Sequence, residues 1–143
     1  MKSTATARWD GSVKDSSGKV TAASGLFKNA PYSMKARFEG GAPGTTPEEL
    51  IAAAHAACYT MALGVGLMKA GLASKSIETT AVVEVVLGEG GANITESALQ
   101  CKVEVPGADK EKVRALAEGA KTGCPVSKAL AGVKITLALD VKV

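Results

Sequence analysis

Two of the three cysteines in this 143-residue chain lie where a sulfur atom could do chemistry. Cys58 is part of the run HAACYTMAL, three residues after His55, the only histidine. Cys124 is followed by Pro125 at the start of a predicted short helix, where unpaired backbone N–H groups and the helix dipole favour a thiolate. Because the thiolate is the reactive form of cysteine, Cys58 and Cys124 are the candidate nucleophiles.

Cys58 needs a nearby cation to be reactive, because apolar neighbours on a helix raise the pKa of a buried thiol. The chain has three arginines, and Arg37 precedes the segment that carries Cys58 most closely. Its planar guanidinium could bridge the thiolate and a carboxylate such as Glu48. The alternative is a surface ion pair, which would add little stability.

The other two candidate groups have simpler interpretations. His55 and Cys58 share a helix face, so they could form half of a metal site or a base and nucleophile pair. No second histidine or acidic cluster completes such a site, and a lone histidine in an alanine-rich helix is more often a hydrogen-bonded packing residue. Cys101 alternates with Leu99 and Val103 on the apolar face of a predicted strand, which favours a structural role.

The clearest element is a helix over residues 47–70, which would carry Cys58 in its middle. Thr46 is its predicted N-cap, Pro47 occupies the first position, Glu49 completes a capping box and Gly71 ends it. Alanine, glycine and aliphatic residues cover nearly its whole circumference. This composition predicts a helix that is buried in a core or against another chain.

Short strands and turns are predicted before this helix. Alternation in 4–9 and 19–24 indicates two strands, residues 15–19 and 28–33 read as turns, and residues 34–40 predict a strand with Arg37 near its end.

Alternating strands and two helices are predicted after it. The strands cover 77–87, 94–105 and 133–143, and a loose connection over 88–93 joins the first two. Helices follow over 109–121, capped by Asp109, and from Cys124 onward. The pattern predicts an α+β fold of antiparallel sheets with a long buried helix, within a single domain over 1–143.

Composition excludes several classes of function. The net charge of +3 comes from dispersed lysines without a basic run or interleaved aromatic residues, so nucleic acid is not expected as a partner. No signal peptide, membrane span or glycine-rich nucleotide loop is evident, which predicts a cytoplasmic protein without a nucleotide site. Three scattered cysteines do not form a secreted disulfide framework.

Three segments together resemble a known family. RFEGG, then GTTPEELIAAAHAACYTMAL, then AKTGCPVSKAL are similar to the OsmC/Ohr family of organic hydroperoxide peroxidases, and to its osmotically inducible OsmC branch most of all. The resemblance covers essentially the whole chain.

This resemblance implies a cysteine-based peroxidase, an organic hydroperoxide reductase of class EC 1.11.1, that acts in oxidative and osmotic stress defence. Cys58 would be the peroxidatic cysteine and Cys124 the resolving cysteine that forms a redox-active disulfide with it, while Arg37 and Glu48 would form the matching charged pair. The family uses no metal or other cofactor and depends on an external dithiol, of lipoyl type in the Ohr branch. Its members are intertwined homodimers that share two active sites.

The spacing of Glu48 and Cys58 adds a hypothesis about the dimer. Ten residues span about 15 Å along a straight helix, so an antiparallel partner helix would bring its Glu48 nearer to Cys58. Two non-catalytic alternatives remain at this stage. One is a metal-binding protein that uses His55, Cys58 and Cys124, and the other binds an apolar ligand with idle cysteines.

Overall fold

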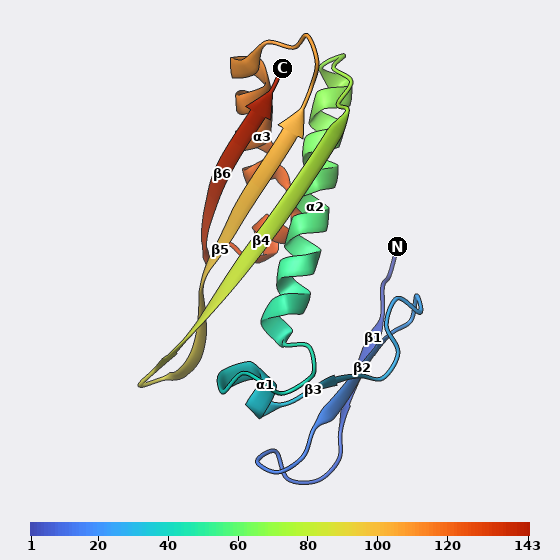
Figure 1. The fold of residues 1–143 in the computed structure, drawn as a ribbon, viewed down its shortest axis with the longest axis vertical. Helices are drawn as coiled ribbons and strands as arrows, with labels where there is room; N and C mark the ends of the chain where they lie inside the picture. The colour runs from blue at the N-terminus through green and yellow to red at the C-terminus, as the bar shows by residue number, and fades with distance from the viewer. The chain divides into compact units, whose positions relative to one another are not determined.

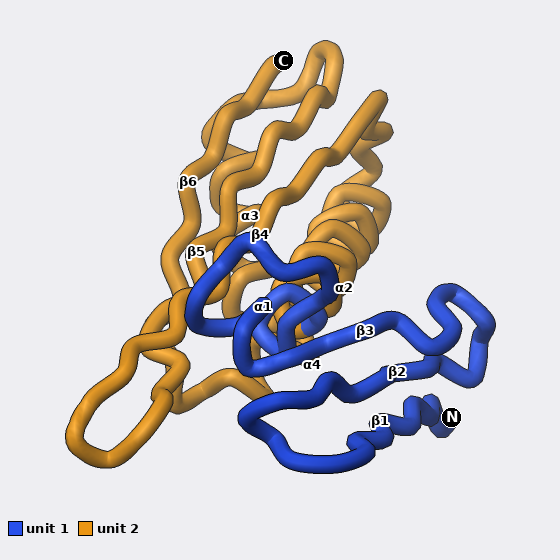
Figure 2. Tube along the Cα trace, turned by 60° about the horizontal axis from the view of Figure 1, so that its bottom comes forward, with its two compact units in different colours: residues 1–50 blue, residues 51–143 orange.

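The computed structural model describes residues 1–143 and divides them into two compact units, Met1–Leu50 and Ile51–Val143 (Figure 2). Each unit contains a three-stranded sheet, and a long helix, α2 (Pro47–Lys69), begins in the first unit and runs through the second (Figure 1). The predicted α+β class is therefore confirmed. A single domain over 1–143 stays a prediction, as does the dimer.

The first unit is built on the antiparallel strands β1 (Ala5–Trp9), β2 (Gly18–Ala22) and β3 (Ala30–Tyr32). The first two were predicted, whereas the prediction of a turn over 28–33 was wrong for β3. Pro31 donates no backbone hydrogen bond, but an edge strand tolerates that. Trp9 and Tyr32 form an edge-to-face pair over Gly18, where a Cβ atom would come within 2.4 Å of the Tyr32 ring.

Arg37 lies on a short helix, α1 (Met34–Phe38), so the prediction of a strand over 34–40 was wrong. Apolar and charged residues alternate there as in a strand, but the Ser33 hydroxyl accepts a hydrogen bond from the Ala36 N–H at 3.0 Å. This N-cap and the backbone bond from Arg37 to Ser33 close a helical turn.

The α2 helix begins as predicted. The Glu49 N–H donates to the Thr46 hydroxyl at 3.1 Å, while the Glu49 carboxylate accepts from Thr45 instead of closing the second half of the capping box. Within this chain α2 is buried along one face, and its burial against another chain stays a prediction. Side chains four residues apart are buried, namely His55, Tyr59, Leu63 and Leu67, whereas Met61, Val65 and Met68 on other faces are exposed.

The second unit places helices on one face of a mixed sheet (Figure 1). Its strands are β4 (Ser76–Gly88), β5 (Gly91–Glu104) and β6 (Lys134–Lys142), and its further helices are α3 (Lys110–Gly123) and α4 (Pro125–Ala129). The β4 and β5 strands form the predicted antiparallel hairpin. The β5 and β6 strands are parallel, where an antiparallel pair was expected, because the α3 and α4 crossover returns the chain to the same end of the sheet.

The core of the second unit lies between this sheet and its helices. Eleven residues form one buried cluster, which draws mainly on α2, β5 and α3 (Tyr59, Leu63, Leu67, Leu99, Cys101, Val103, Val105, Val113, Ala117, Ala120 and Val141). The packing fixes α2 against the strands, so the positions of His55 and Cys58 follow from it.

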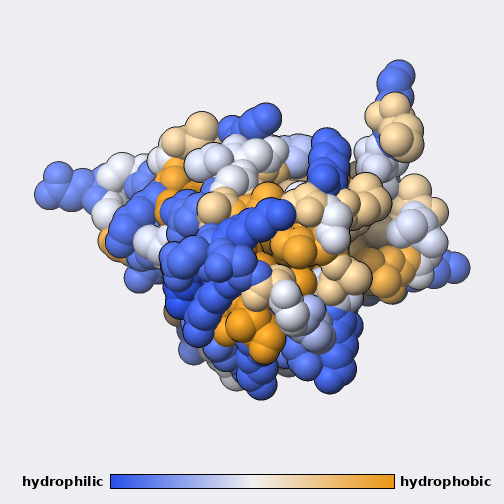
Figure 3. Space-filling model, turned by 90° about the horizontal axis from the view of Figure 1, so that it is seen from above, coloured by the Kyte–Doolittle hydropathy of each residue, from blue (hydrophilic) through white to orange (hydrophobic).

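Apolar surface remains exposed between hydrophilic areas (Figure 3). By length and composition α2 could cross a membrane, and 22% of its most apolar 18-residue window is buried in the structure. This is weak evidence for a membrane span, since the core helix of a water-soluble protein passes the same test. One face of α2 contributes Tyr59, Leu63 and Leu67 to the core.

Candidate active site

Cys58 and Cys124, the two cysteines that the family resemblance pairs, lie near each other in the second unit. Both are free thiols close enough to interact with each other. Cys58 is partly exposed on α2, whereas Cys124 is fully buried at the junction where α3 ends and α4 begins. The structure thus pairs an accessible sulfur with an inaccessible one.

The two thiols differ in acidity. Burial raises the pKa of Cys58, the neighbouring Cys124 raises it further, and only the Val126 N–H opposes this. Burial also raises the pKa of Cys124, but the Cys58 thiol, the Ser127 N–H and the Ser127 hydroxyl outweigh it and lower the net value. The Cys124 sulfur makes no capping hydrogen bond of ordinary geometry, yet these donors lie near it.

Cys58 opens onto an apolar groove between α2 and α3. The groove encloses about 520 Å³. Its walls are mainly aliphatic or backbone and include Met61 and Val65 from α2 and Leu116 and Gly119 from α3. A substrate with an alkyl tail would bury that tail against these side chains while its reactive end met the Cys58 sulfur.

Arg37 and Glu48 form the predicted ion pair inside the first unit. The guanidinium donates from Nε at 3.0 Å and from Nη2 at 2.5 Å to the same carboxylate oxygen, and it also lies 4.8 Å from the centre of the Phe38 ring. Glu48 is 6% exposed, whereas the Arg37 side chain is 27% exposed. Arg37 is therefore held at one end and keeps part of its surface free for another anion.

The carboxylate of Glu48 is stabilised in its charged form. Burial raises its pKa, but hydrogen bonds from Arg37 and from the helix backbone, with the Arg37 charge, outweigh burial and lower the net pKa. Two carboxylates begin α2 near the positive end of its dipole, as predicted.

His55 is fully buried and has a partner at each ring nitrogen. Its Nδ1 lies 2.7 Å from the Ser97 hydroxyl and its Nε2 lies 2.9 Å from the Ser127 hydroxyl. Burial lowers the pKa of the ring. His55 is thus the hydrogen-bonded packing residue that was predicted. No group of three ligating side chains converges in the structure.

Sequence reasoning missed Ser97 and Ser127. Ser97 is separated from His55 by 42 residues and Ser127 by 72. The one available signal was the position of Ser127, three residues after the Cys124 N-cap, where side chains return to the start of a helix.

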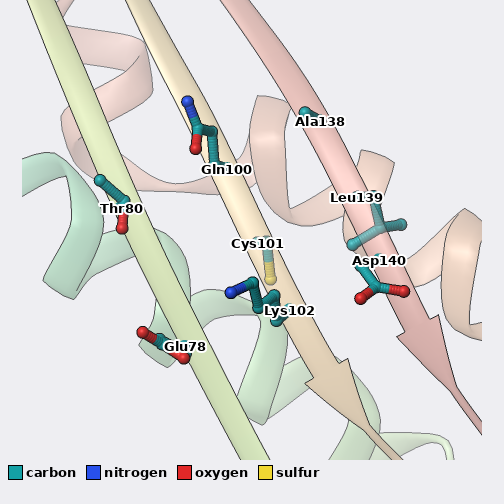
Figure 4. Close-up of a pocket in the computed structure, with 8 residues that line it drawn as sticks. All are labelled: Glu78, Thr80, Gln100, Cys101, Lys102, Ala138, Leu139 and Asp140. Carbon is teal, nitrogen blue, oxygen red and sulfur yellow. The ribbon is translucent and has the colours of Figure 1, made fainter.

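Cys101 is remote from this chemistry. It is 2% exposed in the core, and burial raises its pKa. A hollow of about 340 Å³ also lies along the β4, β5 and β6 strands, where charged side chains including Glu78, Lys102 and Asp140 line it (Figure 4). The one thiol in its lining, Cys101, is buried.

Comparison with known proteins supports the resemblance noted from the sequence. A family model described as OsmC-like protein matches residues 39–138. The chain is 45% identical over 136 residues to Peroxiredoxin OsmC of Escherichia coli (strain K12), which covers 95% of the chain and 94% of that protein. It is 33% identical over 103 residues to an organic hydroperoxide resistance protein of Xanthomonas axonopodis pv. citri (strain 306), with 69% of each covered.

Solved structures agree with this assignment. The organic hydroperoxide resistance protein OhrB of Bacillus subtilis superposes with a TM-score of 0.72 at 29% identity and covers 95% of this chain and 97% of its own. An organic hydroperoxide resistance protein OsmC of Legionella pneumophila gives 0.70 at 26% identity, covering 98% of this chain and 97% of its own. The chain therefore belongs to the OsmC-like protein family.

Proposed function

We propose that this protein is a cysteine-based peroxidase that reduces organic hydroperoxides to alcohols in oxidative and osmotic stress defence. The observation that carries the proposal is the pair of free, interacting thiols with an apolar groove leading to the accessible one. The names of the relatives, a peroxiredoxin and organic hydroperoxide resistance proteins, support the same reaction.

The reaction is a two-step oxidation of Cys58. Its thiolate attacks the terminal peroxide oxygen, the O–O bond breaks, and the alkoxide takes a proton and leaves as an alcohol. Cys58 is then a sulfenic acid. The Cys124 thiolate attacks that sulfur, the S–O bond breaks, and hydroxide leaves and is protonated to water as the disulfide forms. An external dithiol, of lipoyl type by the resemblance, supplies two electrons and two protons to regenerate both thiols.

Arg37 is the cation that the Cys58 thiolate requires in this proposal. No residue of the second unit lowers the pKa of Cys58 with a positive charge, since its pKa is raised by burial and by Cys124. Arg37 is bound to Glu48 through part of its donors and retains exposed surface. Glu48 would orient it, and the guanidinium would stabilise the thiolate.

We further propose a homodimer with shared sites in the cytoplasm. The exposed apolar side chains Met61, Val65 and Met68 give α2 a face that a second copy would bury. An α2 helix of the second copy packed on that face would also cover the groove beside Cys58. The covered groove would bind an alkyl tail more strongly than the open one.

Peroxide consumption tests the proposal. Wild type, Cys58→Ser, Cys124→Ser and the matched control Cys101→Ser would be mixed with cumene hydroperoxide or hydrogen peroxide and dihydrolipoamide. We expect the wild type and the Cys101 variant to consume the organic peroxide faster than hydrogen peroxide, and the Cys58 variant to be inactive. If all four proteins are equally inactive, the alternative of a non-catalytic protein that binds an apolar ligand in the groove replaces the peroxidase.

A further inference from the structure

His55 is a buried titratable group that the proposed reaction does not use. It lies on α2 and connects two serine hydroxyls, one on β5 and one on α4, and all three residues are 5% exposed or less. The α4 serine, Ser127, is the third residue after Cys124, the N-cap of α4, so both side chains lie at the first turn of that helix. The hydrogen bonds therefore run from Ser97 on β5 through His55 to Ser127, in the first turn of the helix that Cys124 precedes.

The hydrogen-bond donors and acceptors around His55 determine which ring nitrogen carries the proton. Ser97 has no side-chain partner other than His55, so its proton is satisfied only if Nδ1 accepts it. The ring proton then lies on Nε2 and is donated to the Ser127 oxygen. A ring protonated at Nδ1, or at both nitrogens, would leave the buried Ser97 proton without an acceptor. Burial lowers the pKa of His55 and so favours the neutral ring.

This form of the ring determines where the Ser127 proton points. Since Ser127 accepts from His55, its own proton is free to be donated elsewhere. Cys124, three residues earlier at the N-cap of the same helix, offers its sulfur as an acceptor. If Nε2 were the acceptor instead, Ser127 would donate to the ring and its proton would be lost to the sulfur.

We propose that His55 is a positioning residue, which holds the Ser127 hydroxyl as a hydrogen-bond donor toward the Cys124 sulfur through a neutral ring protonated at Nε2. The consequence for turnover rests on the proposed function: a larger thiolate fraction of Cys124 speeds its attack on the Cys58 sulfenic acid. The arrangement of protons itself does not depend on that reaction.

Nuclear magnetic resonance tests the ring form directly, because the chain has a single histidine. Protein labelled with ¹⁵N, with any affinity tag removed, gives one pair of ring nitrogen signals. We expect a neutral ring with the proton on Nε2 at neutral pH and in mild acid. A proton on Nδ1, or a charged ring at neutral pH, overturns the proposal.

Cysteine labelled with ¹³C at Cβ then measures the pKa of Cys124. Ser127→Ala removes the donor, and we expect the pKa to rise by about one unit, or about tenfold less thiolate at a fixed pH. Ser127→Thr keeps the hydroxyl and should stay near wild type. His55→Gln retains an N–H toward Ser127 and should also stay near wild type, whereas His55→Leu should behave like Ser127→Ala.

An unchanged Cys124 pKa in Ser127→Ala overturns the proposal. If His55→Leu does not fold, the position of the ring proton in the wild type still tests the role of His55. The outcomes separate the two hypotheses. A shifted pKa in a protein that consumes no peroxide would refute the proposed peroxidase but keep the positioning role. If the protein consumes peroxide but the pKa of Cys124 is unchanged in Ser127→Ala, the positioning role is refuted and the proposed peroxidase is kept.

Discussion

The rate of peroxide reduction should rise with the length of the substrate's alkyl tail, because the groove beside Cys58 is apolar and accommodates about 520 Å³. A methylene buried completely contributes about 0.8 kcal/mol, which is about fourfold in kcat/KM. In a groove open on one side about half of each methylene is buried, which gives about 0.4 kcal/mol and about twofold. From ethyl to hexyl hydroperoxide we expect roughly 16-fold for an open groove and roughly 250-fold for a covered one.

Gly119→Leu should remove this dependence. A Cβ atom at Gly119 meets nothing within 4 Å, so a leucine there projects into the groove without a clash, and it also favours the helix. The matched control is Gly132→Leu, which has equally open surroundings but lies outside the groove.

The assay is consumption of each alkyl hydroperoxide with excess dithiol at substrate concentrations below KM. We expect Gly119→Leu to reduce ethyl hydroperoxide with the kcat/KM of the wild type. We expect no further rise in kcat/KM for hydroperoxides with longer tails. A rate that does not depend on tail length in the wild type, or a Gly119 variant that keeps the gain, would refute the assignment of the groove to the tail.

Three further predictions concern stability and local packing. Glu48→Gln should lower the free energy of unfolding by about 2 kcal/mol near neutral pH through its weakened bonds to Arg37. Because the folded pKa of Glu48 is lowered, this contribution is complete above the unfolded value and is lost as the pH falls through the folded one, which denaturant titrations at several pH values would measure. Leu63→Ala should cost about 2–5 kcal/mol, since Leu63 is fully buried. Gly18→Ala should displace Trp9, the only tryptophan, and change its fluorescence.

Leu63→Ala and Gly18→Ala each have a matched control. Val82→Ala removes an exposed side chain and should stay within about 0.5 kcal/mol of wild type. Gly88→Ala adds a Cβ with open space around it and should leave the tryptophan spectrum unchanged. A Glu48 variant that keeps wild-type stability at every pH would show that the ion pair contributes nothing net. Equal losses for Leu63→Ala and Val82→Ala would contradict the core described above.

Local signals in the sequence predicted the elements that depend on neighbouring residues. Thr46 and Pro47 mark the start of α2, and the hydroxyl of Thr46 does accept the predicted bond. The same kind of signal failed at α1, where alternation typical of a strand was overridden by the Ser33 cap. A segment of five residues forms few bonds of its own, so a single side-chain hydrogen bond decides its conformation.

The residues of the candidate site were also selected from the sequence, although their arrangement in space was only partly anticipated. Cys58, Cys124, Arg37 and Glu48 were selected from residue type and spacing alone, and the Arg37 to Glu48 bond that was anticipated forms over a separation of 11 residues. Residue type is enough here because only a few side chains can form a thiolate or stabilise one.

By itself, the sequence determined the long helix, the alternating strands, the family and the candidate side chains for the chemistry, because each of these depends on residue type or on neighbours along the chain. Only the tertiary structure decided that β6 lies parallel to β5, that one face of α2 is buried and that His55 lies between two serines. These features join residues tens of positions apart, and packing of the α2, α3 and sheet layers selects which of them meet. The periodicity of residues along the chain does not indicate which of these distant residues come into contact.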